Sequence, residues 1–172
     1  MNNYYAGHEG HAQHISVGAV MRNAEGLVRV HHFPADAAKG FWAGEAITDF
    51  YILMRETLEP NETLEHALAR GLAEEFNAAA SLDGYLGAIV ATAYAGNDRE
   101  GKKPFQKTTL YFLSTYQKDA GERRDLSDAE GKSELEWKSA EELIPLMRAQ
   151  KERFGRDDLD ESTILERYLA QL

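Results

Sequence analysis

The chain has 172 residues, of which 43% are hydrophobic and 28% charged, and this is ordinary for one soluble globular domain with a sizeable core. It carries 19 Lys and Arg against 29 Asp and Glu, a formal net charge of −10. Such an acidic surface repels a phosphate backbone, so we expect no nucleic-acid polymer as a partner. The absence of cysteine excludes disulfides, thiolate metal sites and a cysteine nucleophile.

No apolar run approaches the roughly 18 residues that a membrane helix needs. The first 14 residues are polar and rich in histidine, without the apolar core of a signal peptide. We therefore expect a cytoplasmic protein with no membrane partner.

The first 61 residues predict a β-hairpin, an insertion and a short strand. The segment HISVGAVM is apolar and β-branched, and LVRVHHF alternates after a turn signal, NAEG. Residues 34–49 hold Gly and Trp without clear periodicity. The expected elements are a polar arm at 1–13, strands at 14–21 and 27–33, a loop at 34–49, a strand at 50–54 and a loop at 55–61.

Residues 63–76 form the clearest predicted helix. Leu64, Leu68 and Leu72 recur at every fourth position and give the segment one apolar face. Thr63, or Asn61 before it, is a residue type that caps helix N-termini. Asn77 follows the last turn and suits a left-handed end.

The second half predicts strands and then two helices. Apolar, β-rich segments predict strands at 85–94 and 108–116 and a short edge strand at 134–137, separated by polar loops at 96–104 and 119–132. Helical spacing follows at 140–153 and 160–171. The chain is thus expected to be a single layered α/β domain over 1–172, a mixed sheet with three helices and a C-terminal helix within 159–172.

Two adjacent carboxylates lie at the edge of the buried face of the helix at 63–76. Gly71, Glu74 and Glu75 fall within about 100° of arc, beside the leucine stripe. Carboxylates held on a packed helix suit a hard cation such as Mg²⁺ or Mn²⁺. The alternative is a solvated acidic face with no ligand. Arg70 can pair with Glu74, or reach back to Glu62.

The spacing of this segment resembles the Nudix box, G-x5-E-x7-R-E-U-x-E-E-x-G-U, in which U is aliphatic. The matching residues are Glu62, Arg70, Leu72, Glu74 and Glu75. The preceding FYILMRETLEPNE also looks like the segment that leads into this box. The resemblance covers most of the chain and implies the Nudix α/β/α sandwich around a mixed β-sheet.

Three box positions differ from the pattern. Glu56 stands at the first glycine, Asn77 at the last glycine, and Gly71 at a glutamate that usually binds metal in the family. Arg55 also replaces a glycine of the preceding loop, which places bulk and charge where the family's backbone carbonyl approaches the metal. Either Glu56 or Glu59 replaces the lost carboxylate, or the site has lost its activity.

The resemblance implies a metal-dependent pyrophosphohydrolase that cleaves a nucleoside diphosphate derivative with Mg²⁺ or Mn²⁺. The alternative is an inactive Nudix fold that binds a nucleotide or a protein. By position, Glu75 and Glu74 would bind the metal with the Arg55 carbonyl, and Glu62 and Arg70 would brace the loop. A later acidic residue would be the general base, and the candidates are Glu130, Glu134 and Glu136.

Other residues suggest weaker hypotheses. Aromatic Trp42, with Phe41, could stack on a base, and the basic cluster of Lys107 with Lys102 and Lys103 could meet phosphate. The run His8, His11 and His14 has ligand-like spacing, although His14 leads into a strand. Nudix proteins often dimerise, so we expect either a homodimer through the C-terminal helix or packing of this helix on its own sheet.

Overall fold

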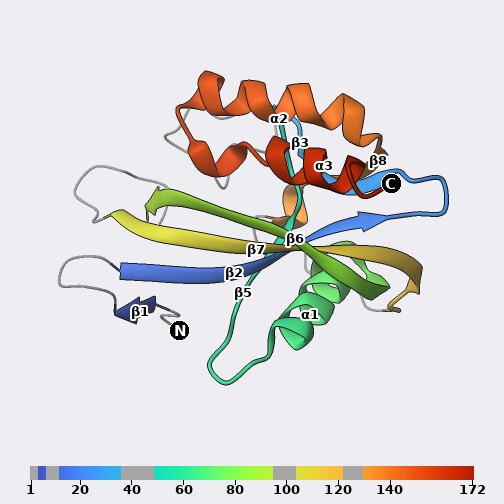
Figure 1. Ribbon diagram of the computed structural model, residues 1–172, viewed down its shortest axis with the longest axis horizontal. Coiled ribbons are helices and arrows are strands. Elements are labelled where there is room, and N and C mark those ends of the chain that lie inside the picture. Colours follow the sequence, from blue (N-terminus) through green and yellow to red (C-terminus); the bar gives the residue numbers. More distant parts are fainter. Residues whose placement is uncertain (1–3, 7–11, 36–48, 95–103, 122–129) are drawn as a thin grey trace.

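The computed structural model describes residues 4–6, 12–35, 49–94, 104–121 and 130–172. Its strands form one mixed sheet, with helix α1 on one face and helices α2 and α3 on the other (Figure 1). This three-layered arrangement confirms the expected α/β/α sandwich. Within the described ranges, no helix is long and apolar enough to cross a membrane.

Strand β2 (Ala12–Arg22) organises the sheet. It runs parallel to β7 (Pro104–Asp119) and antiparallel to β1 (Tyr4–Ala6), β3 (Val28–Phe33) and β5 (Met54–Thr57). Strand β7 also pairs with β6 (Ala78–Tyr94), and β3 pairs with β4 (Phe50–Ile52) and β8 (Glu134–Lys138). The predicted hairpin is therefore confirmed, as is the short strand near residue 134.

The predicted strand at 50–54 is wrong in one respect, because two strands occupy this region. Strand β4 pairs with β3, and β5 pairs with β2. Between them, the backbone N–H of Leu53 donates to the Glu161 carboxylate at 2.7 Å. The chain thus changes partner strand at Leu53, and residues 55–57, which we expected in a loop, continue as β5.

The predicted limits of the two longest strands are also wrong. Strand β6 begins directly after α1, seven positions before the predicted start at 85, and β7 extends beyond 108–116 at both ends. Pairing between β6 and β7 shifts register near Gly84 and Gly87, and these irregularities interrupt the alternation that a sequence pattern would show. Residues 4–6 of the expected polar arm form a strand as well.

The helices are α1 (Leu64–Phe76), α2 (Ala140–Phe154) and α3 (Ser162–Leu169). The Thr63 side chain accepts from the His66 N–H at the start of α1, and Asn77 ends it with φ of 50°. Both predicted ends of α1 are thus confirmed. The C-terminal helix is shorter than the predicted 160–171: it follows the 3-10 turn η3 (Asp157–Leu159), begins at Ser162 and ends at Leu169.

Each face of the sheet has its own apolar core. One core joins α1 to β2 and β5 through residues such as Met54, Leu68 and Leu72. The other joins α2 and α3 to the opposite face, and it buries Ile164, Leu165 and Tyr168 of α3. The C-terminal helix therefore packs on its own sheet, and the homodimer stays a prediction.

Candidate functional site

The first feature of the site is the close approach of α1 to strand β5 at Gly71. A Cβ atom at this position would lie 2.7 Å from the Glu56 Cβ and 2.8 Å from the Met54 sulfur. No real Cβ contact is that short, so a side chain at 71 requires Glu56 to move. The Glu56 side chain thus occupies the space beside Gly71, where the box pattern places a glutamate.

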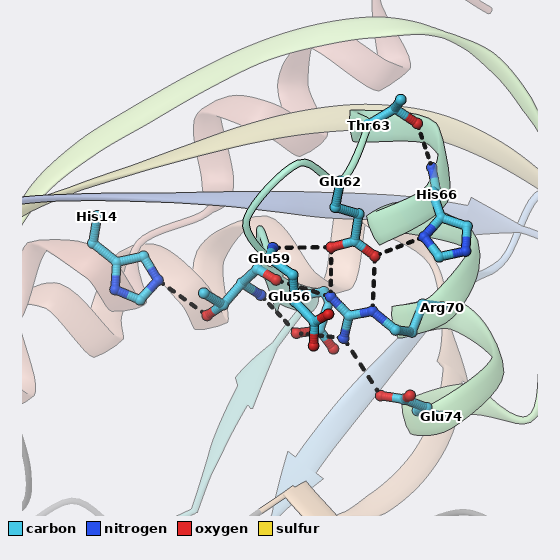
Figure 2. Close-up of polar contacts among 9 residues, drawn as sticks. His14, Glu56, Glu59, Glu62, Thr63, His66, Arg70 and Glu74 are labelled. Carbon is cyan, nitrogen blue, oxygen red and sulfur yellow. Dashed lines mark hydrogen bonds and ion pairs between the residues drawn. The ribbon is translucent and has the colours of Figure 1, made fainter. Parts of the chain in front are cut away.

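Arg70 is the centre of the polar contacts around this point (Figure 2). Its guanidinium donates two hydrogen bonds of 2.9 Å to the Glu62 carboxylate and one of 3.0 Å to the Thr57 carbonyl. Its remaining nitrogen, Nη1, lies 3.1 Å from a Glu56 oxygen and 3.6 Å from a Glu74 oxygen. The sequence left Glu62 and Glu74 open as partners of Arg70, and the structure pairs it with both.

The carboxylates around Arg70 differ in their electrostatics. Hydrogen bonds from Arg70 lower the pKa of Glu62 to about 2. Burial raises the pKa of Glu56, and this outweighs the opposite effect of the neighbouring guanidinium. Glu62 is thus a fixed anion, whereas Glu56 is a partly desolvated carboxylate that an additional positive charge would stabilise.

The two box glutamates occupy different environments. The Glu74 side chain is 50% exposed, whereas that of Glu75 is 10% exposed. Glu75 accepts at 2.7 Å from Nε2 of the buried His31, whose Nδ1 lies 2.7 Å from the Ser133 hydroxyl. Neither glutamate points freely into solvent, but only Glu74 shares the Arg70 cluster.

Arg55 does not obstruct the α1 side of β5. Adjacent residues of a strand point to opposite faces, so Met54 and Glu56 face α1 while Arg55 faces away. The Arg55 guanidinium donates to the Asp158 carbonyl at 2.8 Å and lies 3.8 Å from the buried Glu161. The expected placement of bulk and charge at the metal approach is therefore wrong for this side chain.

Two of the three candidates for a general base, Glu134 and Glu136, lie on a different face from Glu75. His31 and His32 are consecutive in β3, so their side chains lie on opposite faces of the sheet. His32 Nδ1 lies 2.6 Å from Glu136, and His32 Nε2 lies 2.8 Å from Asp49. Glu134 pairs with His32 in the sheet register. The structure thus does not bring Glu134 and Glu136 to the Arg70 cluster.

These residues form a second group of metal-ligand types. In the described part of the chain, His32, Glu134 and Glu136 are the one set of three with ligand atoms within 4.8 Å of one another. Lys138 lies 3.3 Å from Glu136, and both ring nitrogens of His32 already meet carboxylates. His32 and Glu136 are therefore engaged with each other and with Asp49 and Lys138.

The remaining residues that the sequence singled out either make other contacts or lie outside the described ranges. Glu59 is exposed, and its backbone N–H donates to Glu62 at 3.0 Å. His14 bonds Thr57 at 3.0 Å, and burial lowers its pKa to about 4. Lys107 contributes to the same shift, because its positive charge acts on His14. The residues that lie outside the described ranges are His8, His11, Phe41, Trp42, Lys102 and Lys103, and the side chain of Glu130 is not described.

The sequence did not identify the partners of Glu75. The alternating strand predicted at 27–33 puts His31 on one face of the sheet, but no local pattern pairs it with Glu75. Ser133 gives no signal at all, because it meets His31 across 102 positions of chain. The complementary changes at 56 and 71 were a usable signal, since one position gains the carboxylate that the other lacks.

The chain is similar to known proteins of one family. A family model described as the NUDIX domain matches residues 12–158. No curated protein matches the chain by sequence. The chain is similar in structure to a NUDIX hydrolase from Nitrosomonas europaea, with a TM-score of 0.60 and 16% identity over 92% of this chain and 90% of that one.

A second solved structure, of the E. coli ORF135 protein, has a TM-score of 0.50 and 17% identity over 92% of this chain and 89% of that one. Identities this low show a shared fold alone. The family assignment therefore depends on the domain match, which spans most of the sheet, α1 and α2.

Proposed function

The chain belongs to the NUDIX domain family, and from this premise we propose that it hydrolyses a pyrophosphate bond in a nucleoside diphosphate derivative with a divalent cation. Family membership supports a Nudix-type hydrolase, and such enzymes generally use divalent cations. The substrate class and the metal are part of the proposal.

The observation that carries the proposal is the exchange between positions 56 and 71. The box pattern has glycine first and glutamate second, and this chain has Glu56 and Gly71. Because the Glu56 Cβ lies 2.7 Å from where a Cβ at 71 would be, the two positions share one space. Glu56 thus brings a carboxylate side chain to that space, which supports the proposal that it replaces the missing ligand.

The cation would be held by oxygen donors on the flank of α1. Glu56 and Glu74 both face Nη1 of Arg70, and Glu75 lies on the same stretch of helix. Carboxylate oxygens are the donors that Mg²⁺ and Mn²⁺ prefer. Glu59 and the Arg55 carbonyl are further oxygen donors on the segment that leads to the helix. Their ligand role stays a prediction.

The bound cation would supply charge neutralisation on the pyrophosphate and activation of a water molecule. The net charge of −10 would otherwise oppose binding of an anionic substrate. Glu62 and Arg70 serve a different purpose, because their two-fold hydrogen bond ties the loop before α1 to the helix. Arg70 thereby holds Glu56 and Glu74 on one side of the helix.

Hydrolysis by purified protein tests the proposal. The protein is incubated with nucleoside diphosphate sugars, dinucleoside polyphosphates and nucleoside triphosphates, each with Mg²⁺ or Mn²⁺. Release of phosphate or nucleotide that is lost in Glu75→Gln supports it. Release no greater than that of Glu75→Gln with every substrate contradicts it.

A second candidate is a binding module without turnover. It is favoured by the bond between Glu75 and His31, because this contact engages the carboxylate that the box pattern assigns to the metal. Thermal stabilisation by a nucleotide in EDTA, with no hydrolysis in the assay above, favours this candidate. Turnover with either metal rejects it.

A further inference from the structure

A separate cavity of about 220 Å³ lies beyond the end of α1, on the same face of the sheet as Glu75. It is smaller than the roughly 300–1,000 Å³ of pockets for drug-sized ligands, so it suits one ring system. The residues that line it come from six elements and are Met21, Arg29, Phe76, Ala78, Tyr116, Asp119 and Trp137.

The positively charged side chain in this cavity, Arg29, has few hydrogen-bond partners. The Arg29 guanidinium lies 5.0 Å from the centre of the Trp137 ring, and its Nε is buried with no hydrogen-bond partner. Within the described part of the chain, its two other guanidinium nitrogens make no hydrogen bond or ion pair. Burial lowers the pKa of Arg29, as expected for a charge that has lost water without gaining a close anion.

Asp119 supplies a negatively charged hydrogen-bond acceptor to the cavity. Its carboxylate is exposed and accepts one hydrogen bond, from the Tyr116 hydroxyl at 2.9 Å. A carboxylate accepts several hydrogen bonds, so it has capacity for further donors. The cavity therefore offers the guanidinium donors of Arg29 and the carboxylate acceptors of Asp119 to one ligand.

Aromatic rings supply the walls between these two groups. Tyr116 and Trp137 meet edge to face with ring centres 5.8 Å apart, and Phe76 lines the same cavity. Aromatic surfaces bind planar bases by stacking, at roughly 1–3 kcal/mol for each base. A flat ring system with hydrogen-bonding edges fits this combination.

We propose that this cavity binds a guanine base. Arginine pairs in a fork with the O6 and N7 acceptors of guanine. The N1–H and N2–H groups of guanine are donors on the neighbouring edge, which matches the free acceptor capacity of Asp119. Adenine places an amino donor where guanine has O6, and a donor there opposes Arg29.

The cavity lies near Glu75, so this inference rests on the proposed hydrolysis and names the base of the nucleotide substrate. Arg29 and His31 lie on the same face of β3, about 7 Å apart by the rise of a strand. Phe76 follows Glu75 directly. A nucleotide with its base in the cavity can therefore extend its phosphates toward Glu75.

The test is binding of GMP, which has no pyrophosphate to cleave, to the full chain in EDTA. Calorimetric titration measures affinity for GMP and AMP, and Trp fluorescence of a Trp42→Phe chain reports contact with Trp137. The variants are Arg29→Met, which keeps the stem and loses the donors, and Asp119→Asn. The matched control is Arg148→Met, since Arg148 is an exposed arginine of α2 on the other face.

We expect saturable GMP binding that exceeds AMP binding at least tenfold. Arg29→Met weakens GMP binding by about tenfold or more, Asp119→Asn reduces the preference for GMP, and Arg148→Met changes neither. Circular dichroism confirms that each variant is folded. No saturable GMP binding by the folded wild-type chain, or equal GMP binding by folded Arg29→Met, overturns the inference. Neither result depends on hydrolysis, so it leaves the proposed function to its own assay.

Discussion

Strand β5 separates two groups of charged side chains that differ in access to solvent. On the α1 side, Glu56 and Glu74 meet Arg70, and each keeps some exposure. On the other side, Glu161 is fully buried and accepts from the Leu53 N–H and the Tyr111 hydroxyl. The first group can exchange partners with an ion from solvent, whereas the second is part of the folded core.

The largest expected effect comes from the buried group. Glu161→Ala removes the acceptor of two buried donors and the carboxylate that lies 3.8 Å from Arg55. We expect a loss of roughly 3–5 kcal/mol in unfolding free energy, as for one partner removed from a buried ion pair. Chemical denaturation measures it. A loss below about 1 kcal/mol would show that this group is not part of the stabilising core.

The next effect comes from Arg70, the shared partner of the exposed group. Arg70→Met removes the two guanidinium hydrogen bonds of Glu62, which keeps only the Glu59 N–H and His66, and frees Glu56 and Glu74 from their cation. We expect destabilisation by about 2 kcal/mol, as for hydrogen bonds lost from a charged group. Hydrolysis should fall by at least tenfold even at temperatures where the variant is folded. Full activity in the folded variant would separate this arginine from the site.

A smaller effect concerns pH and Glu62. Its folded-state pKa of about 2 is below its ordinary value of 4.5, so its contribution to stability is complete above about pH 5. This contribution is lost as the pH falls from about 5 to 2. Glu62→Gln should flatten that decline, as followed by thermal unfolding at each pH. Glu56 acts in the opposite direction, because its raised pKa favours the folded state at lower pH.

The comparable pH control is Glu65, an exposed carboxylate in the first turn of α1. Glu65→Gln should leave the acid limb of the stability curve unchanged. An acid limb that is equally steep in wild type and Glu62→Gln would contradict the assignment of this limb to Glu62.

The smallest effect tests the shared space at Gly71. Gly71→Ala places a Cβ against Glu56, and we expect a loss of about 1–2 kcal/mol from overpacking, after a gain of about 1 kcal/mol in helix propensity. Adding Glu56→Gly should recover part of this loss, because it removes the nearest clashing atom. Denaturation of both single variants and the double variant measures the coupling. Additive effects would show that the two positions are independent.

Local signals predicted α1 well, and distant pairings explain what was missed. Thr63 and Asn77 act within one turn of the helix, so their residue types were sufficient to set its ends. The break at Leu53 depends on Glu161, 108 positions away, and no local pattern contains that information. The same reason explains the undetected contact between Glu75 and His31, which are 44 positions apart.

The metal-ligand role of Glu56 is the central claim, and a Mn²⁺ titration followed by electron paramagnetic resonance tests it most directly. The samples are wild type, Glu56→Gln and the control Glu65→Gln, each confirmed to be folded. The account predicts that Glu56→Gln weakens Mn²⁺ binding by about tenfold or more and that Glu65→Gln does not. Equal Mn²⁺ affinity in wild type and Glu56→Gln would contradict it.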